Sequence, residues 1–196
     1  YHLLYRKNRK MKITVPDSLA DISVKQYKQL AEIEFKEDST EWIIESISLL
    51  CGLSKEQVGS LTMPEVEKIS KIISRLNNAD ENNQELSTKI KYKGKKYGFH
   101  PNLSKLTVGE FADLETYCGG GFFDNLNEIL SILYRPIKTE GGDFYTIEKY
   151  KGDVFPNYWD NLKMDVVMGA VNFFLSIGVT LTKGLANSLA VEVEGT

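Results

Sequence analysis

The sequence predicts an α+β fold in which helices predominate, built from two pseudo-repeated strand-plus-three-helix units that pack as one body. Apolar residues recur at helical spacing behind serine and threonine residues, which are favoured helix caps. Short β-like runs stop at Pro16 and Pro101, and the order strand, proline, capped helix occurs twice. We also expect a β-hairpin near 88–99 and an extra strand near 144–148.

The first unit is expected to open with a short strand over residues 12–15 that stops at Pro16. A helix follows, with Ser23 as its N-cap and Gln26 three residues later. In such a capping box the serine hydroxyl satisfies a free N–H of the first helical turn, and the glutamine side chain reaches back to the cap. This spacing therefore predicts a well-defined helix start.

Three further helical segments complete the first unit. Ser39 or Thr40 is expected to cap the second helix, which ends at Gly52. Ser54 caps a short piece. Pro64 lies in the first turn of the next helix, where the missing N–H of proline has no partner to lose.

Two β features are expected in the second half. Residues 89–92 and 95–99 flank Lys93 and Gly94, and glycine accepts the positive φ that a tight hairpin turn requires. Residues 144–147 resemble an additional strand after a pair of glycines. This strand would belong to an insertion in the second unit.

The second unit repeats the residue order of the first. Residues 100–114 match residues 15–30 with one residue deleted, and Gln26 or Glu110 stands three residues after each hydroxyl cap. We interpret this as an internal duplication. The alternative is that two unrelated amphipathic helices share cap chemistry because stable helix starts commonly do.

The spacing between matching elements supports the duplication. The offset is 84 residues at the caps and 83 where 126–133 matches 43–50. It rises to about 101 where 164–173 matches 63–72 more loosely, and an insertion at 137–153 explains the rise. Two copies are too few for an open solenoid, so we expect a closed body.

These patterns divide the chain into segments. Met11 resembles a translation start, so the residues before it are interpreted as a leader that is not native. The expected segments are the leader at 1–10, the first unit at 11–78, a polar linker at 79–87, the second unit at 88–182 with its insertion at 137–153, and a C-terminal tail at 183–196.

Charge is distributed unevenly along the chain. The net charge is −3, yet residues 1–12 hold five basic residues and no acidic one. The remaining residues carry 19 basic and 27 acidic side chains, and an acidic body does not attract nucleic acid. The apolar stretch 164–181 contains Asp165 and Asn172, which favours a buried helix over a membrane span.

Residues suited to catalysis are few. The histidines are His2, in the leader, and His100, for which a nucleophilic pairing with Cys118 is the one enzymatic alternative. Cys51 and Cys118 are expected as reduced thiols, with a disulfide between them as the less favoured alternative. No metal-binding spacing occurs, and the glycine run 119–121 lacks the residues of a phosphate loop. We therefore predict no enzyme activity, metal or cofactor.

The hairpin offers the best candidate for nucleic-acid binding. Five lysines at positions 89, 91, 93, 95 and 96 flank Tyr92 and Tyr97. The favoured interpretation is that alternating lysines form a solvated face and protect the sheet edge from further pairing.

Protein contact is the remaining expectation. Aromatic residues concentrate in the second half, and aromatic side chains give a large contact area at low entropic cost. We predict Phe122, Phe123, Tyr158 and Trp159 as contact residues because they lie near expected loops. The alternative is that some of them cover the core.

Four stretches resemble small proteins encoded by tailed bacteriophages. They are residues 97–103 (YGFHPNL), 106–117 (LTVGEFADLETY), 133–137 (LYRPI) and 169–174 (GAVNFF), and the resemblance covers most of residues 11–178. It implies a morphogenesis factor, such as a tail-assembly chaperone, without a catalytic residue. Phage structural proteins or further copies of the chain would be its partners, in the cytoplasm of an infected host or in the virion.

That resemblance leaves the exact role open. A structural component of the virion, associated with portal, tail or capsid, is the first alternative to a chaperone. A nucleic-acid-binding accessory protein that uses the hairpin lysines is the second.

Overall fold

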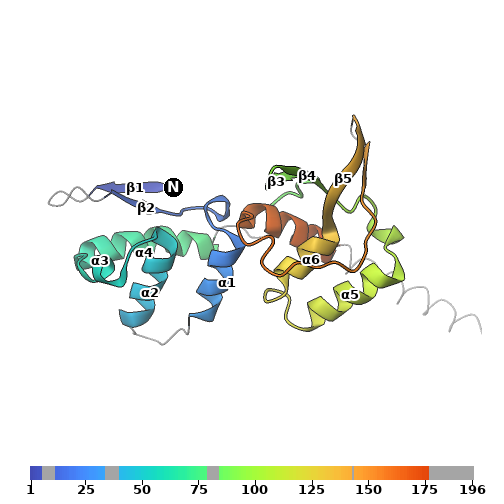
Figure 1. Ribbon diagram of the computed structural model, residues 1–196. Helices are drawn as coiled ribbons and strands as arrows, with labels where there is room; N and C mark the ends of the chain where they lie inside the picture. Colours follow the sequence, from blue (N-terminus) through green and yellow to red (C-terminus); the bar gives the residue numbers. More distant parts are fainter. Residues whose placement is uncertain (6–11, 34–39, 79–83, 143, 177–196) are drawn as a thin grey trace, which may run out of the picture.

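The protein is an α+β chain with a helical majority. The computed structural model describes residues 1–5, 12–33, 40–78, 84–142 and 144–176. It is about 51% helical and 18% strand. Figure 1 shows an elongated arrangement, with the elements of residues 1–78 on one side and those from residue 84 onward on the other.

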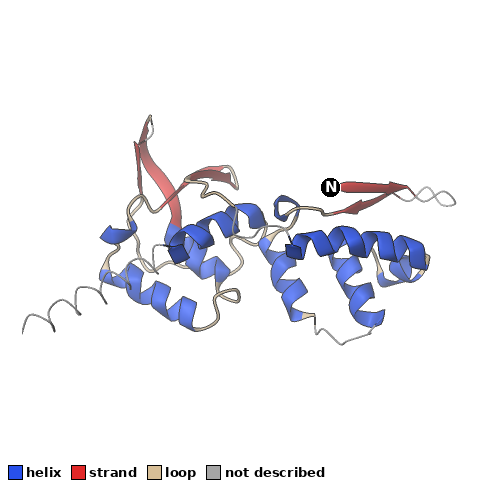
Figure 2. Cartoon of the chain, turned by 180° about the vertical axis from the view of Figure 1, so that it is seen from behind, coloured by secondary structure: helices blue, strands red, loops and turns tan. Residues whose placement is uncertain are grey.

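The first group of elements is mainly helical, and Figure 2 shows its helices below a two-stranded ribbon. Strands β1 and β2 pair antiparallel, with His2 opposite Val15. In chain order the elements are β1 (His2–Tyr5), β2 (Lys12–Val15), the 3-10 turn η1 (Leu19–Asp21), α1 (Val24–Glu32), α2 (Thr40–Cys51), α3 (Lys55–Gly59) and α4 (Met63–Asn78).

The second group combines a sheet with helices. Its four strands are antiparallel in the order β3-β4-β5-β6. A last helix covers residues 164–176. The other elements are β3 (Lys89–Tyr92), β4 (Lys95–Phe99), the 3-10 turn η3 (Leu103–Lys105), α5 (Val108–Gly119), α6 (Leu126–Leu133), β5 (Tyr134–Gly141) and β6 (Phe144–Ile147).

The predicted capping boxes are confirmed. Ser23 begins α1 and Thr107 begins α5, and each hydroxyl accepts a hydrogen bond from the backbone N–H three residues later. The Gln26 and Glu110 side chains in turn accept a hydrogen bond from the backbone N–H of the cap residue. Ser54 caps α3 in the same way. These bonds satisfy N–H groups that have no partner inside the helix.

The predicted hairpin is also confirmed. Strands β3 and β4 pair with Tyr92 opposite Lys95. The two turn residues are left-handed, with φ of 47° at Lys93 and 78° at Gly94, as in the type I′ turn that matches the twist of the flanking strands.

Strand β6 confirms the extra strand, but its partner β5 was not predicted. Pro136 has no N–H to donate, and prolines are rare in central strands. In the structure Pro136 lies opposite Tyr97 of β4, and its carbonyl accepts the Glu148 N–H at 2.9 Å. The β5–β6 register shifts between Ile137 and Thr139.

Two apolar clusters lie along the body. The smaller belongs entirely to the first group and consists of Ile13, Val15, Ile47, Val58, Ile69 and Ile72. The larger fills the second group, where α6, β4 and the helix at 164–176 meet. It also takes in Leu19, Ile22, Val24 and Leu50 of the first group, so the two groups share part of one core.

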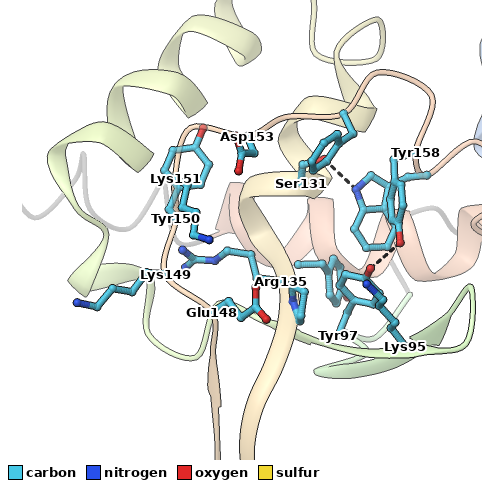
Figure 3. A pocket seen from close by; sticks show the side chains of 14 residues that line it. Lys95, Tyr97, Ser131, Arg135, Glu148, Lys149, Tyr150, Lys151, Asp153 and Tyr158 are labelled. Atoms are coloured by element: carbon cyan, nitrogen blue, oxygen red, sulfur yellow. Dashed lines mark hydrogen bonds between the residues drawn. The ribbon is translucent and has the colours of Figure 1, made fainter.

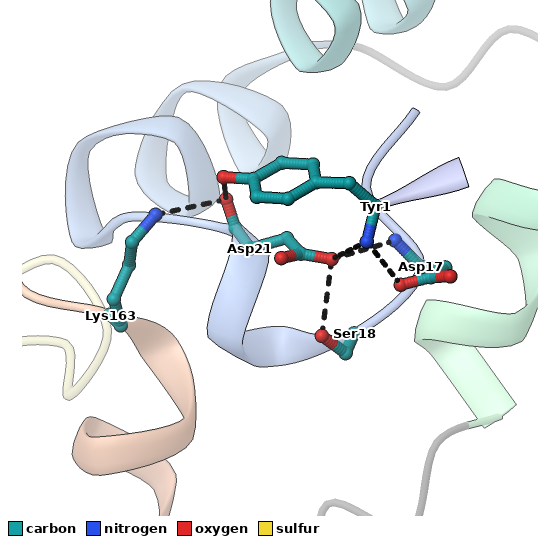
Figure 4. Close-up of polar contacts among 5 residues, drawn as sticks. All are labelled: Tyr1, Asp17, Ser18, Asp21 and Lys163. Atoms are coloured by element: carbon teal, nitrogen blue, oxygen red, sulfur yellow. Dashed lines mark hydrogen bonds and ion pairs between the residues drawn. The ribbon is translucent and has the colours of Figure 1, made fainter. Parts of the chain in front are cut away.

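Main-chain hydrogen bonds join the two groups where α1 begins. The Val24 N–H donates to the Leu162 carbonyl at 3.0 Å, and the Met164 N–H donates to the Ile22 carbonyl at 2.9 Å. The Lys163 ammonium donates to the Asp21 carbonyl at 3.2 Å (Figure 4). We call this contact between residues 21–25 and 160–164 the internal interface.

Several expectations concern segment boundaries. Residues 2–5 of the expected leader form β1, whereas residues 6–10, Ser39 and everything after residue 176 lie outside the described residues. The end of the expected linker packs on the second group, because Leu86 touches the larger cluster and the Tyr134 hydroxyl donates to the Ser87 carbonyl. No helix within the described ranges is long and apolar enough to span a membrane.

The two groups share a local order but then diverge. In each, a strand leads through a proline and a 3-10 turn to a helix with a capping box. Helix α2 is followed by the short helix α3, whereas α6 runs directly into β5. Internal duplication therefore stays a prediction.

Candidate functional site

An open pocket of about 350 Å³ lies between β4, β5, α6 and the segment that precedes the last helix (Figure 3). Aromatic rings and charged side chains line it together. The lining residues are Lys95, Tyr97, Ser131, Tyr134, Arg135, Pro136, Glu148, Lys149, Tyr150, Lys151, Asp153, Phe155, Tyr158 and Trp159.

One wall of the pocket is a cluster of aromatic rings around Trp159. Its ring centroid lies 5.0 Å from Tyr97 and 5.1 Å from Tyr158, both in edge-to-face geometry. The Tyr97 and Tyr158 hydroxyls are 2.5 Å apart. Burial, together with this hydrogen bond, raises the pKa of Tyr97 above its ordinary value. Tyr97 is therefore protonated at neutral pH, and its hydroxyl joins β4 to Tyr158.

The only serine of the pocket lining is already fully engaged. The Ser131 hydroxyl donates to the Asn127 carbonyl at 2.7 Å and accepts from the Trp159 indole N–H at 3.0 Å. A nucleophile needs a free hydroxyl next to a base. Ser131 therefore supports the tryptophan rather than presenting a reactive oxygen.

A buried charge cluster lies beneath the pocket. Arg135 Nη1 is 2.6 Å from Glu110 Oε1, and both side chains are more than nine-tenths buried. The other Glu110 oxygen, Oε2, accepts the Thr107 N–H at 2.6 Å, so one carboxylate caps α5 and pairs with β5. Arg135 Nε has no partner among the described residues.

His100 lies beside this pair as a neutral imidazole. Its Nδ1 accepts the Asn102 N–H at 3.3 Å, which places the ring proton on Nε2, 3.8 Å from Glu110 Oε1. Burial and the positive charge of Arg135 hold the pKa of His100 below its ordinary value of 6.5. Burial also tends to raise the pKa of Glu110, but hydrogen bonds from Thr107 and the charge of Arg135 outweigh it and lower that pKa.

The outer wall and rim carry contact-forming groups. The Tyr150 hydroxyl donates to Asp113 Oδ2 at 2.6 Å, and its ring centroid lies 6.0 Å from the Arg135 guanidinium. Phe155 projects from the rim with 57% of its surface exposed. The rim is therefore apolar and exposed, whereas the Arg135–Glu110 ion pair beneath it is buried.

The structure separates the four predicted contact residues. Tyr158 and Trp159 lie in a turn segment, as expected, and line the pocket together, but Trp159 is buried, with 1% of its surface exposed. Its backbone N–H donates to Asn127 Oδ1 at 2.6 Å and its ring fills the larger cluster. Phe122 is half-buried against that cluster. Phe123 is 42% exposed, with its ring 5.6 Å from Tyr27.

Sequence reasoning missed the residues that shape the pocket floor. No local pattern pairs Arg135 with Glu110, because β5 and α5 meet only in the folded chain. Phe155 and Tyr150 belonged to the group of second-half aromatics but carried no signal that separated them from core residues. The sequence drew attention to Arg135 only as part of residues 133–137, one of the stretches that resemble bacteriophage proteins.

Hairpin lysines are largely committed to the protein itself. Lys89 and Lys96 pair with Glu140 at 3.1 and 2.7 Å. Lys93 donates to the Tyr158 carbonyl at 2.9 Å. Within the described ranges, Lys91 and Lys95 are the hairpin lysines whose ammonium groups make neither an ion pair nor a hydrogen bond, which leaves a small basic surface for nucleic acid.

Cysteines and metal-binding groups show no assembled chemistry where the chain is described. Cys51 and Cys118 are free, half-buried thiols. Burial raises the pKa of both, that of Cys51 to about 11, so both are protonated at neutral pH. The described ranges hold no group of three or more histidine, cysteine or acidic side chains placed for a metal ion.

Large apolar side chains are also exposed outside the pocket, among them Phe144 of β6, which is 86% exposed, and residues of α5 and α4. Val108 and Phe111, on the outer face of α5, are 87% and 59% exposed. Met63, the first residue of α4, is 75% exposed.

We compared the chain with known protein families, with curated proteins and with solved structures, and none of the three comparisons gave a match.

Proposed function

We propose that this chain is a non-enzymatic assembly protein that acts by binding other polypeptides. The observation that carries the proposal is the exposed ring of Phe155 at the rim of the aromatic pocket, with its centroid 6.1 Å from that of Tyr158. An exposed aromatic residue beside a preformed concave surface is the usual anchor of a protein interface.

The pocket suits a partner segment with an apolar side chain followed by an acidic one. The apolar group would pack on Phe155 and Tyr158, and the acidic group would meet the exposed lysines of the lining, Lys95, Lys149 and Lys151. Binding costs little side-chain conformational entropy at this wall, because the Trp159 and Tyr97 rings already pack against each other in the free protein.

We further propose a bacteriophage setting, which rests on the sequence resemblance. In that setting the chain is a tail-assembly-chaperone-like protein in the cytoplasm of the infected host, and its partners are phage structural proteins. The alternative is a structural component of the virion, associated with portal, tail or capsid. A nucleic-acid-binding accessory role is a further alternative, and salt-dependent binding to DNA would favour it.

The two groups of elements are also proposed to derive from one duplicated unit. The shared order of strand, proline, 3-10 turn and boxed helix supports this, as does the constant offset of 84 residues between Ser23 and Thr107 and between Gln26 and Glu110. Residues 137–153, which hold most of β5 and all of β6, would be the insertion.

The test uses tagged chain expressed during phage infection. We expect it to co-purify with a phage structural protein, and Phe155→Ala to weaken that complex. Phe144→Ala removes a still more exposed ring from β6, away from the pocket, and should leave the complex unchanged. Mass spectrometry of finished particles then separates a chaperone, which is absent, from a virion component, which is present. Absence of any complex and of any copy in particles would contradict the proposal.

A further inference from the structure

The internal interface has counterparts exposed elsewhere on the chain. With the offset of 84 residues, Ile22 and Val24 correspond to Leu106 and Val108. With the offset of 101 residues, the segment 160–164 corresponds to 59–63. If the two groups are related units, each side of the internal interface occurs once more in the chain.

The first counterpart lies at the start of α5. Val24 is fully buried against the second group, whereas Val108 is 87% exposed. Tyr27 contacts Phe123, whereas the matching Phe111 is 59% exposed. The apolar residues that make α1 pack on a neighbour are therefore retained in α5, where no neighbour covers them.

The second counterpart lies at the start of α4. Met164 is fully buried beneath α1, whereas the matching Met63 is 75% exposed. Leu162 is buried, and its counterpart Leu61 is half-buried. Val108 and Phe111 are three residues apart and share one face of α5, and Met63 presents the matching apolar side chain at the start of α4.

On the α5 side, main-chain N–H groups also differ between the internal interface, where they are hydrogen-bonded, and the matching positions, where they are not bonded to any residue that the structure describes. At the internal interface the Val24 and Lys25 N–H groups donate to the Leu162 and Asp160 carbonyls, both at 3.0 Å. The matching N–H groups of Val108 and Gly109 have no protein acceptor within the described ranges.

On the α4 side, main-chain groups that are paired at the internal interface likewise have counterparts that are unpaired in the part of the chain that the structure describes. The Met164 N–H donates to the Ile22 carbonyl at 2.9 Å. Among the described residues the matching Met63 N–H has no acceptor, and the Leu106 carbonyl receives no donor. Three hydrogen bonds of the internal interface thus have both partners available at the chain surface: Val108 to Leu61, Gly109 to Gly59, and Met63 to Leu106.

These two surfaces lie at opposite ends of the molecule. Figure 1 shows α3 and the adjoining part of α4 at one end and α5 at the other, and Figure 2 shows the same separation from behind. One chain cannot bring them together. Two chains can, and each would still offer a free surface to the next.

We propose that copies of this chain associate head to tail, with the start of α5 of one copy binding the turn before α4 of the next. The new contact reproduces the internal interface. Because it is heterologous, it continues from copy to copy and produces either a closed ring or an open filament. This inference rests on the proposed duplication and names a second copy as the partner of an assembly protein.

Sedimentation velocity on the full chain tests the proposal with two surface variants. Val108→Glu and Met63→Glu each place a charge on one surface, and acidic residues in a first helical turn are compatible with folding. We expect the wild-type mass to rise with concentration, and each variant to weaken association by roughly tenfold or more. Phe144→Glu, a change of an equally exposed apolar residue on β6, should associate as the wild type does.

A mixture of the two variants gives the decisive result. Each variant keeps the surface that the other has lost, so an equimolar mixture should form dimers and stop there. A wild-type chain that remains monomeric at every concentration would overturn the proposal, as would variants that associate normally or a mixture that stays monomeric. None of these outcomes affects the binding of a phage structural protein at Phe155, so failure here is distinguishable from failure of the proposed function.

Discussion

Arg135 and Glu110 form a buried ion pair, with 2.6 Å between Nη1 and Oε1. The pair joins β5 to the start of α5 beneath the pocket. At the same position after the cap of α1 stands Gln26, which completes its capping box without a charge. The capping box therefore does not require a charge at position 110. The negative charge of Glu110 is required instead to neutralise the buried Arg135.

Breaking this pair from one side should be costly. Arg135→Met leaves the Glu110 carboxylate buried without a cation, and we expect a loss of about 3–5 kcal/mol in the free energy of unfolding, measured with urea. Adding Glu110→Gln, which keeps the capping box of the Gln26 type, should recover a large part of that loss. A double variant whose loss equals the sum of the two single losses would contradict the coupling.

Stability should fall with acid in two stages. The pKa of His100 is lowered in the folded state, so the unfolded chain binds a proton first as pH falls through 6.5, and folding loses free energy below that pH. The pKa of Glu110 is lowered as well, so its contribution is present above 4.5 and is lost as pH falls through the folded value. Urea midpoints should be measured across this pH range for the wild type and for His100→Gln. The upper stage should be present in the wild type and absent from the variant. An unchanged profile would rule His100 out.

Truncation of Trp159 should cost much more stability than truncation of Phe123. Trp159→Ala removes a ring that is 1% exposed and should cost about 3–5 kcal/mol of stability. Phe123→Ala removes a ring that is 42% exposed and should cost much less. Thermal unfolding of the two variants side by side measures this. Equal losses would show that the described position of Phe123 is wrong.

Gly169 should not tolerate a side chain. A Cβ at this position would lie 2.2 Å from the Glu85 carbonyl oxygen, which is backbone and cannot move aside alone. We expect Gly169→Ala to cost about 1–3 kcal/mol, as overpacking does. Gly119→Ala is the control, because a Cβ there meets nothing within 4 Å. A neutral Gly169→Ala in chemical denaturation would disprove this close packing of residues 84–87.

Features encoded by neighbouring residues could be predicted from the sequence. The hydroxyl and the amide or acid three residues later define the caps at Ser23 and Thr107, and Lys93-Gly94 defines the hairpin turn. In each case the interacting groups are adjacent in the chain, so spacing alone identifies them.

Features that depend on distant contacts could not be predicted. No pattern in the sequence indicated β5, which contains Pro136 and forms between β4 and β6. Trp159 lies in an irregular segment that resembles an exposed loop, and it is buried through packing in the larger cluster and through hydrogen bonds to Asn127 and Ser131. The site floor likewise required knowing that α5 and β5 are neighbours.

Cross-linking between single cysteines tests the head-to-tail account most directly. Met63→Cys and Val108→Cys are made separately in a chain whose Cys51 and Cys118 are replaced by alanine, and a short bismaleimide is added to each variant and to their mixture. The account predicts a cross-linked dimer in the mixture and none in either variant alone. Dimers that form within one variant as readily, or a mixture without product, would contradict it.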